Sequence, residues 1–139
     1  MAMYGVSIGM EHPFGQLEDM LNGAVNCAAQ IHSAMVSFLN FEKEKTWLLI
    51  DNPPSANQFN GVEANLPNID SKEVIMAKLA DIRCLVRSGD SVDVFFAGYC
   101  SKDDGSSSLF TGYDMDGEEK YIEGIIYFYV FHFMGCNLS

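Results

Sequence analysis

Short apolar segments and two longer segments with helical spacing divide this chain into alternating strands and helices. Residues 4–10, 45–50 and 92–97 are apolar, partly β-branched or aromatic, and bounded by glycine, proline or charged residues, so each is predicted to form a strand. Residues 17–39 are predicted to form a helix because their apolar positions fall on one stripe, which comprises Leu21, Ala24, Val25, Ala28, Ile31, Met35 and Leu39.

A second helix is predicted to begin at residue 70 or 71 and to end before Gly89. Asp70 or Ser71 would cap its first turn, and Glu73 would interact favourably with the helix dipole there. Gly89 is of the residue type that commonly follows the end of a helix. The buried stripe of this helix is expected to comprise Val74, Ile75, Leu79, Ile82, Leu85 and Val86.

The remaining segments are expected to be loops, turns and short strands. Residues 52–70 and 101–108 are rich in proline, asparagine, glycine or serine and lack apolar periodicity, which predicts two loops. Residues 109–113 resemble a short strand and residues 114–119 an acidic turn. Residues 125–134 form an apolar run that fits a buried strand, a short core helix, or a terminus without its usual packing partner.

The resulting order, β-α-β-loop-α-β-loop-β, predicts the class of the fold. Strands that alternate with helices pair in parallel through right-handed crossovers, with helices on both faces of the sheet. We therefore expect an α/β protein with a mostly parallel sheet in a three-layer α/β/α sandwich. At 139 residues the chain is expected to form one domain, residues 1–139, with residues 125–139 as an atypical apolar C-terminal segment.

Charge narrows the classes of partner. The chain has 8 basic and 19 acidic residues, which gives a net charge of −11. Nucleic acids and anionic membranes bind cationic surfaces, so neither is expected as a partner. The acidity favours a basic protein or peptide partner, or a divalent cation, although acidic side chains that only confer solubility explain it equally well.

The cysteines and the N-terminal residues favour a cytoplasmic protein. The four cysteines are widely spaced, without a C-x-x-C pair, so neither a zinc knuckle nor a disulfide framework is predicted. Residues 1–9 lack the basic start and the long apolar core of a signal peptide. The apolar run at 125–134 is too short to cross a bilayer as a helix.

Several segments together resemble the p20 core of the caspases and metacaspases, the C14 cysteine peptidases. The main one is Ser88-Gly89-Asp90 followed by Phe95-Phe96-Ala97-Gly98-Tyr99-Cys100, in which a Gly-Asp turn leads into a strand that ends on glycine. Three others occur in the family's order: residues 21–28 (Leu-Asn-Gly-Ala-Val-Asn-Cys-Ala), residues 48–51 (Leu-Leu-Ile-Asp) and residues 112–114 (Gly-Tyr-Asp). The resemblance covers residues 4–116 and is closest to the metacaspases.

The resemblance implies a cysteine peptidase site that lacks its base. The family places a histidine general base directly after the glycine of this strand, and here Tyr99 occupies that position. A phenol keeps its proton at neutral pH and is a poor general base. The family's nucleophilic cysteine follows a later strand, which makes Cys136 the candidate nucleophile, although the residues around it depart from the family's pattern. Cys100 is a second reactive-thiol candidate, and His12 is the histidine best placed to replace the base.

Acidic residues after the candidate base suggest a substrate pocket and a cation site. Many metacaspases are activated by calcium. The resemblance therefore makes Asp103, Asp104 and Asp116, which lie in acidic loops, candidate calcium ligands. Solvated turns explain these residues at least as well, because the remaining ligands of an EF-hand loop are missing. Metacaspases select Arg or Lys through an acidic pocket, to which Asp114 would contribute by position.

Three functions follow from these observations. The favoured one is a catalytically inactive or impaired caspase-like domain that acts by association, as a decoy or regulator of proteolysis or cell death, with an active caspase-like paralogue as one candidate partner. Dimerisation through the sheet edge formed by the aromatic run at 127–131 is consistent with this function. The alternatives are an active Arg- or Lys-directed endopeptidase with an unusual base, and a small acidic inhibitor or immunity-type protein.

Overall fold

A computed structural model gives the fold of the chain. It describes residues 2–11, 23–51, 62–66, 71–103, 106–123 and 131–137. The side chains of the short strand at 62–65 and of residues 100–103, 106–108, 110, 123 and 131–137 are not described, so these residues are placed by their backbone alone.

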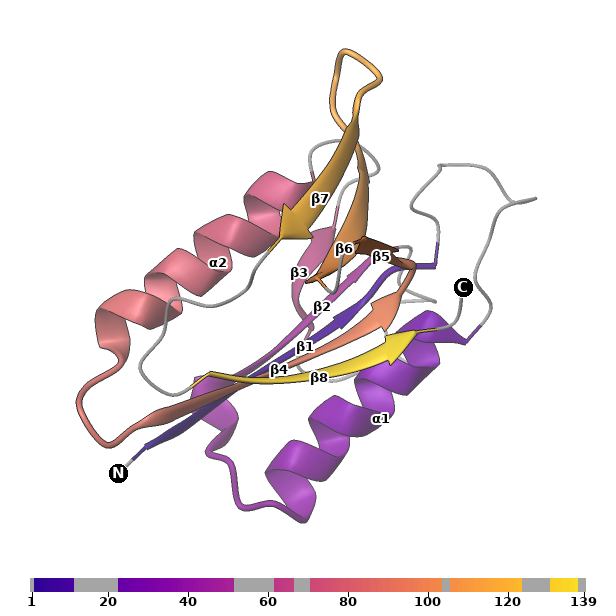
Figure 1. Cartoon of the computed structure of the whole chain (residues 1–139). Coiled ribbons are helices and arrows are strands. Elements are labelled where there is room, and N and C mark those ends of the chain that lie inside the picture. The colour runs from indigo at the N-terminus through magenta and orange to yellow at the C-terminus, as the bar shows by residue number, and fades with distance from the viewer. Residues whose placement is uncertain are drawn as a thin grey trace.

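The described residues form a mixed α/β structure (Figure 1). The helices are α1 (Ala24–Ser37) and α2 (Ser71–Leu85), and one 3-10 turn, η2, spans Lys43–Lys45. The strands are β1 (Met3–Gly9), β2 (Thr46–Asp51), β3 (Val62–Leu66), β4 (Ser91–Gly98), β5 (Cys100–Asp103), β6 (Ser106–Tyr113), β7 (Glu119–Glu123) and β8 (Phe131–Asn137). Within the described residues, no helix is long and apolar enough to cross a membrane.

Five strands form one parallel sheet in the order β3-β2-β1-β4-β8. Strand β1 is central, with Gly9 opposite Ile50 of β2 and Ala97 of β4. The parallel pairing expected from the alternation of strands and helices is confirmed. Because all five strands run the same way, their carboxyl ends lie along one edge of the sheet.

One described helix lies against each face of this sheet (Figure 1). Helix α2 packs Ile75, Leu79 and Ile82 into a buried cluster that includes Val6 and Ile8 of β1. Helix α1 packs on the opposite face, where its buried residues meet two clusters built from alternate positions of β2 and β4, namely Leu48, Ile50, Phe95 and Ala97. The period-2 alternation of the strands thus supplies both cores.

Helix α1 approaches β1 very closely. A Cβ atom added at Gly9 would lie 2.8 Å from the carbonyl oxygen of Ala24 and 2.8 Å from Cβ of Ala28. The hydroxyl of Ser7, which is fully buried, donates a 2.6 Å hydrogen bond to the carbonyl of Ala28. The small residues of both elements, rather than large apolar ones, therefore set the position of α1.

Two segments that were expected to be loops contain strands. Within residues 52–70, Val62–Leu66 forms β3, an edge strand that pairs with β2. Residues 101–108 belong largely to the antiparallel strands β5 and β6, and β7 was not anticipated. These strands are short or rich in serine, so pairing with a neighbour stabilises them and intrinsic preference does not reveal them.

The predicted helices are largely correct, with exceptions at their ends. Residues 71–85 form α2 as expected, whereas residues 17–22 of the first predicted helix lie outside the described residues. Leu85 and Leu39 were expected in the buried stripes, but they are 53% and 51% exposed. Both lie at the last turn of a helix or beyond it, where the helix no longer covers the sheet. The expected turn at residues 114–119 is present, except that Glu119 already begins β7.

Candidate functional site

The order of the strands identifies one place along the carboxyl ends of the strands as the candidate site. From β1 the chain builds outward to β2 and β3 on one side, and β4 and β8 lie on the other side. The carboxyl ends of β1 and β4 therefore form a switch point, where the connections leave in opposite directions. Open α/β sheets bind their ligands at such switch points.

Tyr99 lies at this switch point. It follows β4 directly, and its side chain is half-buried. The backbone of β1 continues beside β4, because the N–H of Met10 donates a 3.0 Å hydrogen bond to the carbonyl of Ala97. There is no room for a side chain at Gly98, where an added Cβ would lie 2.7 Å from the ring of Phe96. Tyr99 is thus held at the carboxyl edge by the two central strands.

Cys136 lies on the strand next to Tyr99. In β8 its backbone pairs with Ala97 of β4, and Asn137 pairs with Gly98. The candidate nucleophile and the candidate base position therefore occupy adjacent strands at the same edge of the sheet. Cys100 begins β5, immediately after Tyr99.

Two carboxylates that sequence reasoning did not assign to the site line the same edge. Asp51, at the end of β2, is 1% exposed and accepts a 2.7 Å hydrogen bond from the N–H of Glu11. The carboxylate of Glu11 in turn accepts a 3.1 Å hydrogen bond from the N–H of Val25 in the first turn of α1. The residue before α1, Gly23, provides no side-chain cap, so Glu11, two residues after the end of β1, supplies the capping carboxylate.

Glu11 could have been found from the sequence by its position. It is the first acidic residue after the first predicted strand, at the end of the strand where α/β folds place their functional groups. The signal is weak in the sequence because Val25, the partner of Glu11, lies 14 residues further along the chain.

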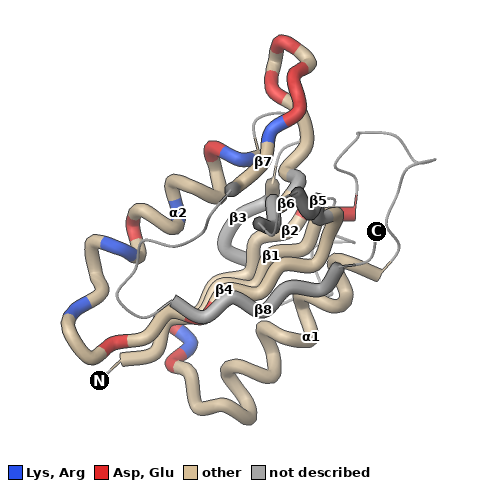
Figure 2. Tube along the Cα trace, in the orientation of Figure 1, with Lys and Arg blue, Asp and Glu red and all other residues tan. Residues whose placement is uncertain are grey.

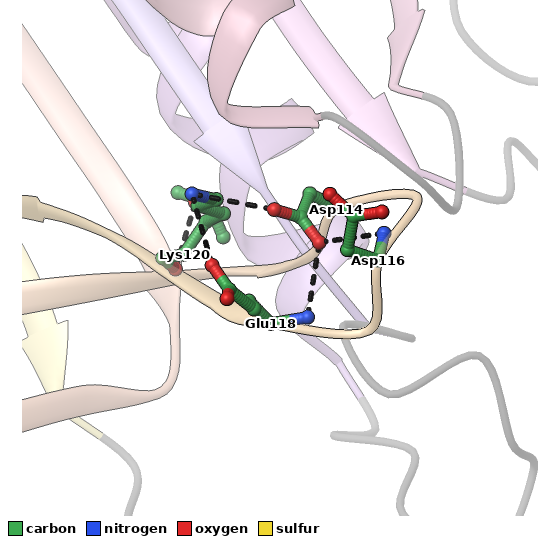
Figure 3. A network of polar contacts seen from close by, with 5 residues as sticks. Asp114, Asp116, Glu118 and Lys120 are labelled. Carbon is green, nitrogen blue, oxygen red and sulfur yellow. Dashed lines mark hydrogen bonds and ion pairs between the residues drawn. The ribbon is translucent and has the colours of Figure 1, made fainter.

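The predicted acidic residues do not gather at this edge. Asp114 and Asp116 lie in the turn between β6 and β7, in a hairpin that projects from the sheet (Figures 1 and 3). Asp103 ends β5 and pairs with Ser106 at the opposite end of β6, and Asp104 lies outside the described residues. Because β6 spans eight residues, or about 23 Å at the rise of a strand, Asp103 and Asp116 cannot bind the same ion.

The carboxylate of Asp114 organises its own turn (Figure 3). It accepts 2.9 Å hydrogen bonds from the N–H groups of Asp116 and Glu118, and the ammonium of Lys120 lies 3.3 Å away. The N–H of Glu118 is the main cause that lowers the pKa of Asp114, and Lys120 and the N–H of Asp116 contribute as well. Lys120 also lies 3.9 Å from Glu118, so an internal cation already neutralises part of this turn.

The candidate calcium ligands form no metal-binding group that the structure describes. Among the described residues, no cluster of three or more histidine, cysteine, aspartate or glutamate side chains has the geometry to hold a metal ion. The calcium site therefore stays a prediction, for each acidic segment separately.

The three histidines have different surroundings. His32 is buried in α1, and burial is the main cause that lowers its pKa, with a smaller contribution from nearby Lys43. His12 lies outside the described residues, and His132 lies in β8, where only the backbone is described. Neither the predicted role of His12 as a replacement base nor the predicted role of Asp114 in substrate binding is tested by these positions.

An open pocket of about 390 Å³ lies elsewhere, between α2 and β7. Its lining contains two lysines, one glutamate and apolar side chains, and it includes none of the predicted site residues. The lining residues are Lys72, Met76, Glu119, Lys120, Tyr121 and Ile122. This mixture of charges specifies no single class of ligand.

Neither the protein families nor the curated proteins provide a relative of this chain. No protein-family model matches the chain, and no curated protein matches it significantly. The candidate site therefore has to be interpreted from its own residues.

Proposed function

We propose that the chain is a caspase-like, p20-type domain whose peptidase site lacks its general base, and that it acts by protein association. In this proposal the fold is the three-layer α/β/α sandwich of that family. The domain would regulate proteolysis or cell death in the cytoplasm. Its partner would be a basic protein or peptide, or an active caspase-like paralogue.

The observation that carries the proposal is the position of Cys136 relative to Tyr99. Cys136 pairs with Ala97, two residues before Tyr99, on adjacent parallel strands at the carboxyl edge. A cysteine peptidase needs a thiolate beside a group that takes its proton. This chain has a cysteine and a tyrosine at the two positions where the resemblance expects the nucleophile and the base.

The surroundings of Tyr99 support an impaired site. The side chains described at this edge are a phenol and two carboxylates, and Glu11 is engaged with the first turn of α1. None of them is an imidazole, the side chain that most often acts as a general base. Removal of a triad base typically lowers the rate by orders of magnitude.

Cleavage of fluorogenic peptides tests this function. Peptides with Arg or Lys before the reporter are incubated with the parent protein, the Tyr99→His variant and the Tyr99→His, Cys136→Ala double variant, each with and without calcium. We expect at most a trace of cleavage by the parent. Tyr99→His should cleave at least about 100-fold faster than this residual rate, because general-base catalysis contributes about 10²–10⁴ in rate. The double variant should lose this activity.

Two controls separate chemistry from folding. Tyr99→Phe, which has no group able to take a proton, should be as inactive as the parent, and all variants should unfold at similar temperatures. Parent activity that disappears in Cys136→Ala would instead establish the alternative, an active endopeptidase with an unusual base. A well-folded Tyr99→His variant without activity would remove the support for a peptidase-derived site.

A further inference from the structure

The pocket between α2 and β7 runs along one edge of a strand (Figure 1). Four of its six lining residues are consecutive in β7, residues 119–122, and the other two, Lys72 and Met76, come from the first two turns of α2. Successive side chains of a strand point to opposite faces of the sheet. A pocket that four successive residues line therefore lies beside the edge of the strand and not over one of its faces.

The hydrogen bonds of β7 show which of its backbone groups point toward the pocket. The carbonyl of Glu118 accepts a 3.0 Å hydrogen bond from the N–H of Asp114, and the carbonyl of Lys120 accepts a 3.0 Å hydrogen bond from the hydroxyl of Thr111. Both donors lie on the side of β6, so the even-numbered residues direct their backbone groups toward β6. The residues between them direct theirs to the other edge. Within the described residues, no strand pairs with that edge.

The wall formed by α2 contributes a cation and an apolar side chain. Lys72 is half-buried, and among the described residues it forms no ion pair. Met76, one turn further along α2, is 44% exposed, so a ligand can contact its apolar side chain. On the β7 wall, Lys120 supplies a second ammonium, which already lies 3.3 Å from Asp114. A carboxylate in the pocket would therefore be held mainly by Lys72.

The charges around the pocket favour an acidic ligand. Residues 71–87, which contain α2, include four basic and two acidic residues, so half of the chain's eight basic residues lie here. Figure 2 shows basic positions spread along α2. The acidic lining residue, Glu119, accepts a 2.9 Å hydrogen bond from the hydroxyl of Tyr121 and lies on the opposite face of β7 from Lys120. This part of the molecule attracts acidic segments, although the whole chain has a charge of −11.

We propose that the pocket binds an extended acidic segment of another protein, which adds as a strand to the edge of β7 and places a carboxylate beside Lys72. Strand addition supplies affinity through backbone hydrogen bonds and specificity through alternate side chains. On the α2 side of the added strand, one side chain meets Lys72 and another meets Met76. The inference is independent of the proposed function, because neither Tyr99 nor Cys136 lines the pocket.

The edge of β7 selects a peptide over the other anionic ligands. The lining charges alone specify no class of ligand, and a small anion would use Lys72 while leaving the backbone groups of β7 that face the pocket to water. An extended peptide pairs with these groups and reaches Lys72 at the same time. A basic peptide would meet two lysine side chains, Lys72 and Lys120, and like charges disfavour such a complex.

Binding of labelled peptides to the full chain tests the proposal. The probes are three sets of fluorescein-labelled heptapeptides of threonine and valine, with aspartate, serine or lysine at alternate positions, and fluorescence anisotropy gives the dissociation constants. The aspartate set should bind at least about tenfold more tightly than the serine set, and the lysine set should not bind. Added salt should weaken the binding of the aspartate set, because salt screens the attraction to Lys72.

A second probe separates strand addition from attraction by charge alone. Fully N-methylated aspartate peptides keep their charge but cannot donate backbone hydrogen bonds, so they should not bind. The unmethylated aspartate peptides should slow hydrogen exchange in β7 and leave exchange in α1 unchanged.

A matched pair of variants locates the site. Lys72→Glu should raise the dissociation constant of the aspartate peptides at least about tenfold, because it replaces attraction by repulsion. The substitution suits the fold, since an acidic residue is favourable in the first turn of a helix. Arg83→Glu makes the same change in charge about 16 Å further along α2 and should leave binding nearly unchanged.

Four results would overturn the proposal. They are the absence of binding by every peptide set, equal binding of the aspartate and lysine sets, binding that survives N-methylation, and equal effects of Lys72→Glu and Arg83→Glu. A parent protein that sediments as a dimer and becomes monomeric in Lys72→Glu would also overturn it, because a second copy of the chain would then occupy the pocket.

Discussion

At the scale of single residues, His32 is the clearest source of pH dependence. It is 7% exposed in the middle of α1, and its Nε2 atom is buried without a hydrogen-bond partner among the described residues. A hydrogen bond to the Thr46 backbone favours the protonated ring, but burial outweighs it and lowers the pKa below 6.5. The folded state therefore favours the neutral ring, because protonation would place a charge on the buried Nε2 atom.

We expect stability to fall as the solution is acidified below pH 6.5. The unfolded chain takes up the proton near the ordinary histidine pKa of 6.5, whereas the folded chain takes it up only at lower pH. Between these two values the free energy of unfolding decreases with falling pH, and well above pH 6.5, where the ring is neutral in both states, His32 contributes no slope. Urea denaturation of the parent and of His32→Leu at several pH values measures this dependence.

The His32→Leu variant should lose most of the slope between pH 5 and 7, whatever its absolute stability, because it cannot titrate. An unchanged slope in His32→Leu would show that other groups dominate acid unfolding.

How well single residues could be predicted from the sequence depended on whether their role was local. Tyr99 was located correctly at the end of a strand because the Gly-Asp turn, the apolar run and Gly98 are contiguous. The roles of Glu11 and Asp51 depend on contacts between β1, β2 and α1 that no sequence window contains. Cys136 was a candidate from the resemblance, and only strand pairing put it beside β4.

At the scale of elements, the β6–β7 hairpin depends on one carboxylate. Asp114 accepts hydrogen bonds from two backbone N–H groups of its own turn and pairs with Lys120. We expect Asp114→Ala to loosen the hairpin locally, which hydrogen exchange at residues 116–122 would detect as faster exchange. Asp116→Ala is the matched control, since the bond from residue 116 comes from its backbone N–H and is retained.

This result also bears on the predicted substrate role of Asp114. Asp114→Ala removes both N–H bonds of the turn, whereas Lys120→Ala breaks the ion pair and leaves these bonds in place. If only Asp114→Ala weakened peptide binding, loss of the turn's structure would be enough to explain the effect. Slow exchange in Asp114→Ala, equal to that of the parent, would show that the turn does not need its carboxylate.

Helices and strands were predictable where their own residues form an apolar or periodic segment. They were less predictable where a strand depends on hydrogen bonds to a neighbouring strand. The strands β1, β2 and β4 and the helix α2 are continuous apolar or periodic segments, and each was located within a few residues. Strands β3 and β7 mix polar and apolar residues and exist next to β2 and β6. The β5–β6 hairpin does have a signal in the sequence, because Asp104-Gly105 is a dipeptide typical of two-residue hairpin loops.

At the scale of the whole molecule, net charge governs the response to salt. With 19 acidic and 8 basic residues, the folded state suffers more self-repulsion than the extended chain. We expect the thermal unfolding midpoint to rise as sodium chloride screens this repulsion. Calorimetry at increasing sodium chloride, and at equal ionic strength with calcium chloride, measures the effect.

The comparison of the two salts tests the calcium site. If the acidic segments only confer solubility, calcium and sodium chloride at equal ionic strength should raise the midpoint by similar amounts. A rise that saturates with calcium alone, and that Asp116→Ala abolishes, would establish a specific site in the hairpin. A midpoint that falls with salt would contradict the dominance of self-repulsion.

The central position of β1 has a consequence for the order in which the chain can fold during synthesis. Strand β1 emerges from the ribosome before the other strands, yet it gains its first neighbour, β2, only after residue 51 and its second, β4, only after residue 98. Sheets built from such distant segments fold slowly and expose unpaired edges in the meantime. A nascent chain arrested before β4 would therefore present β1 and its apolar residues as a template for aggregation.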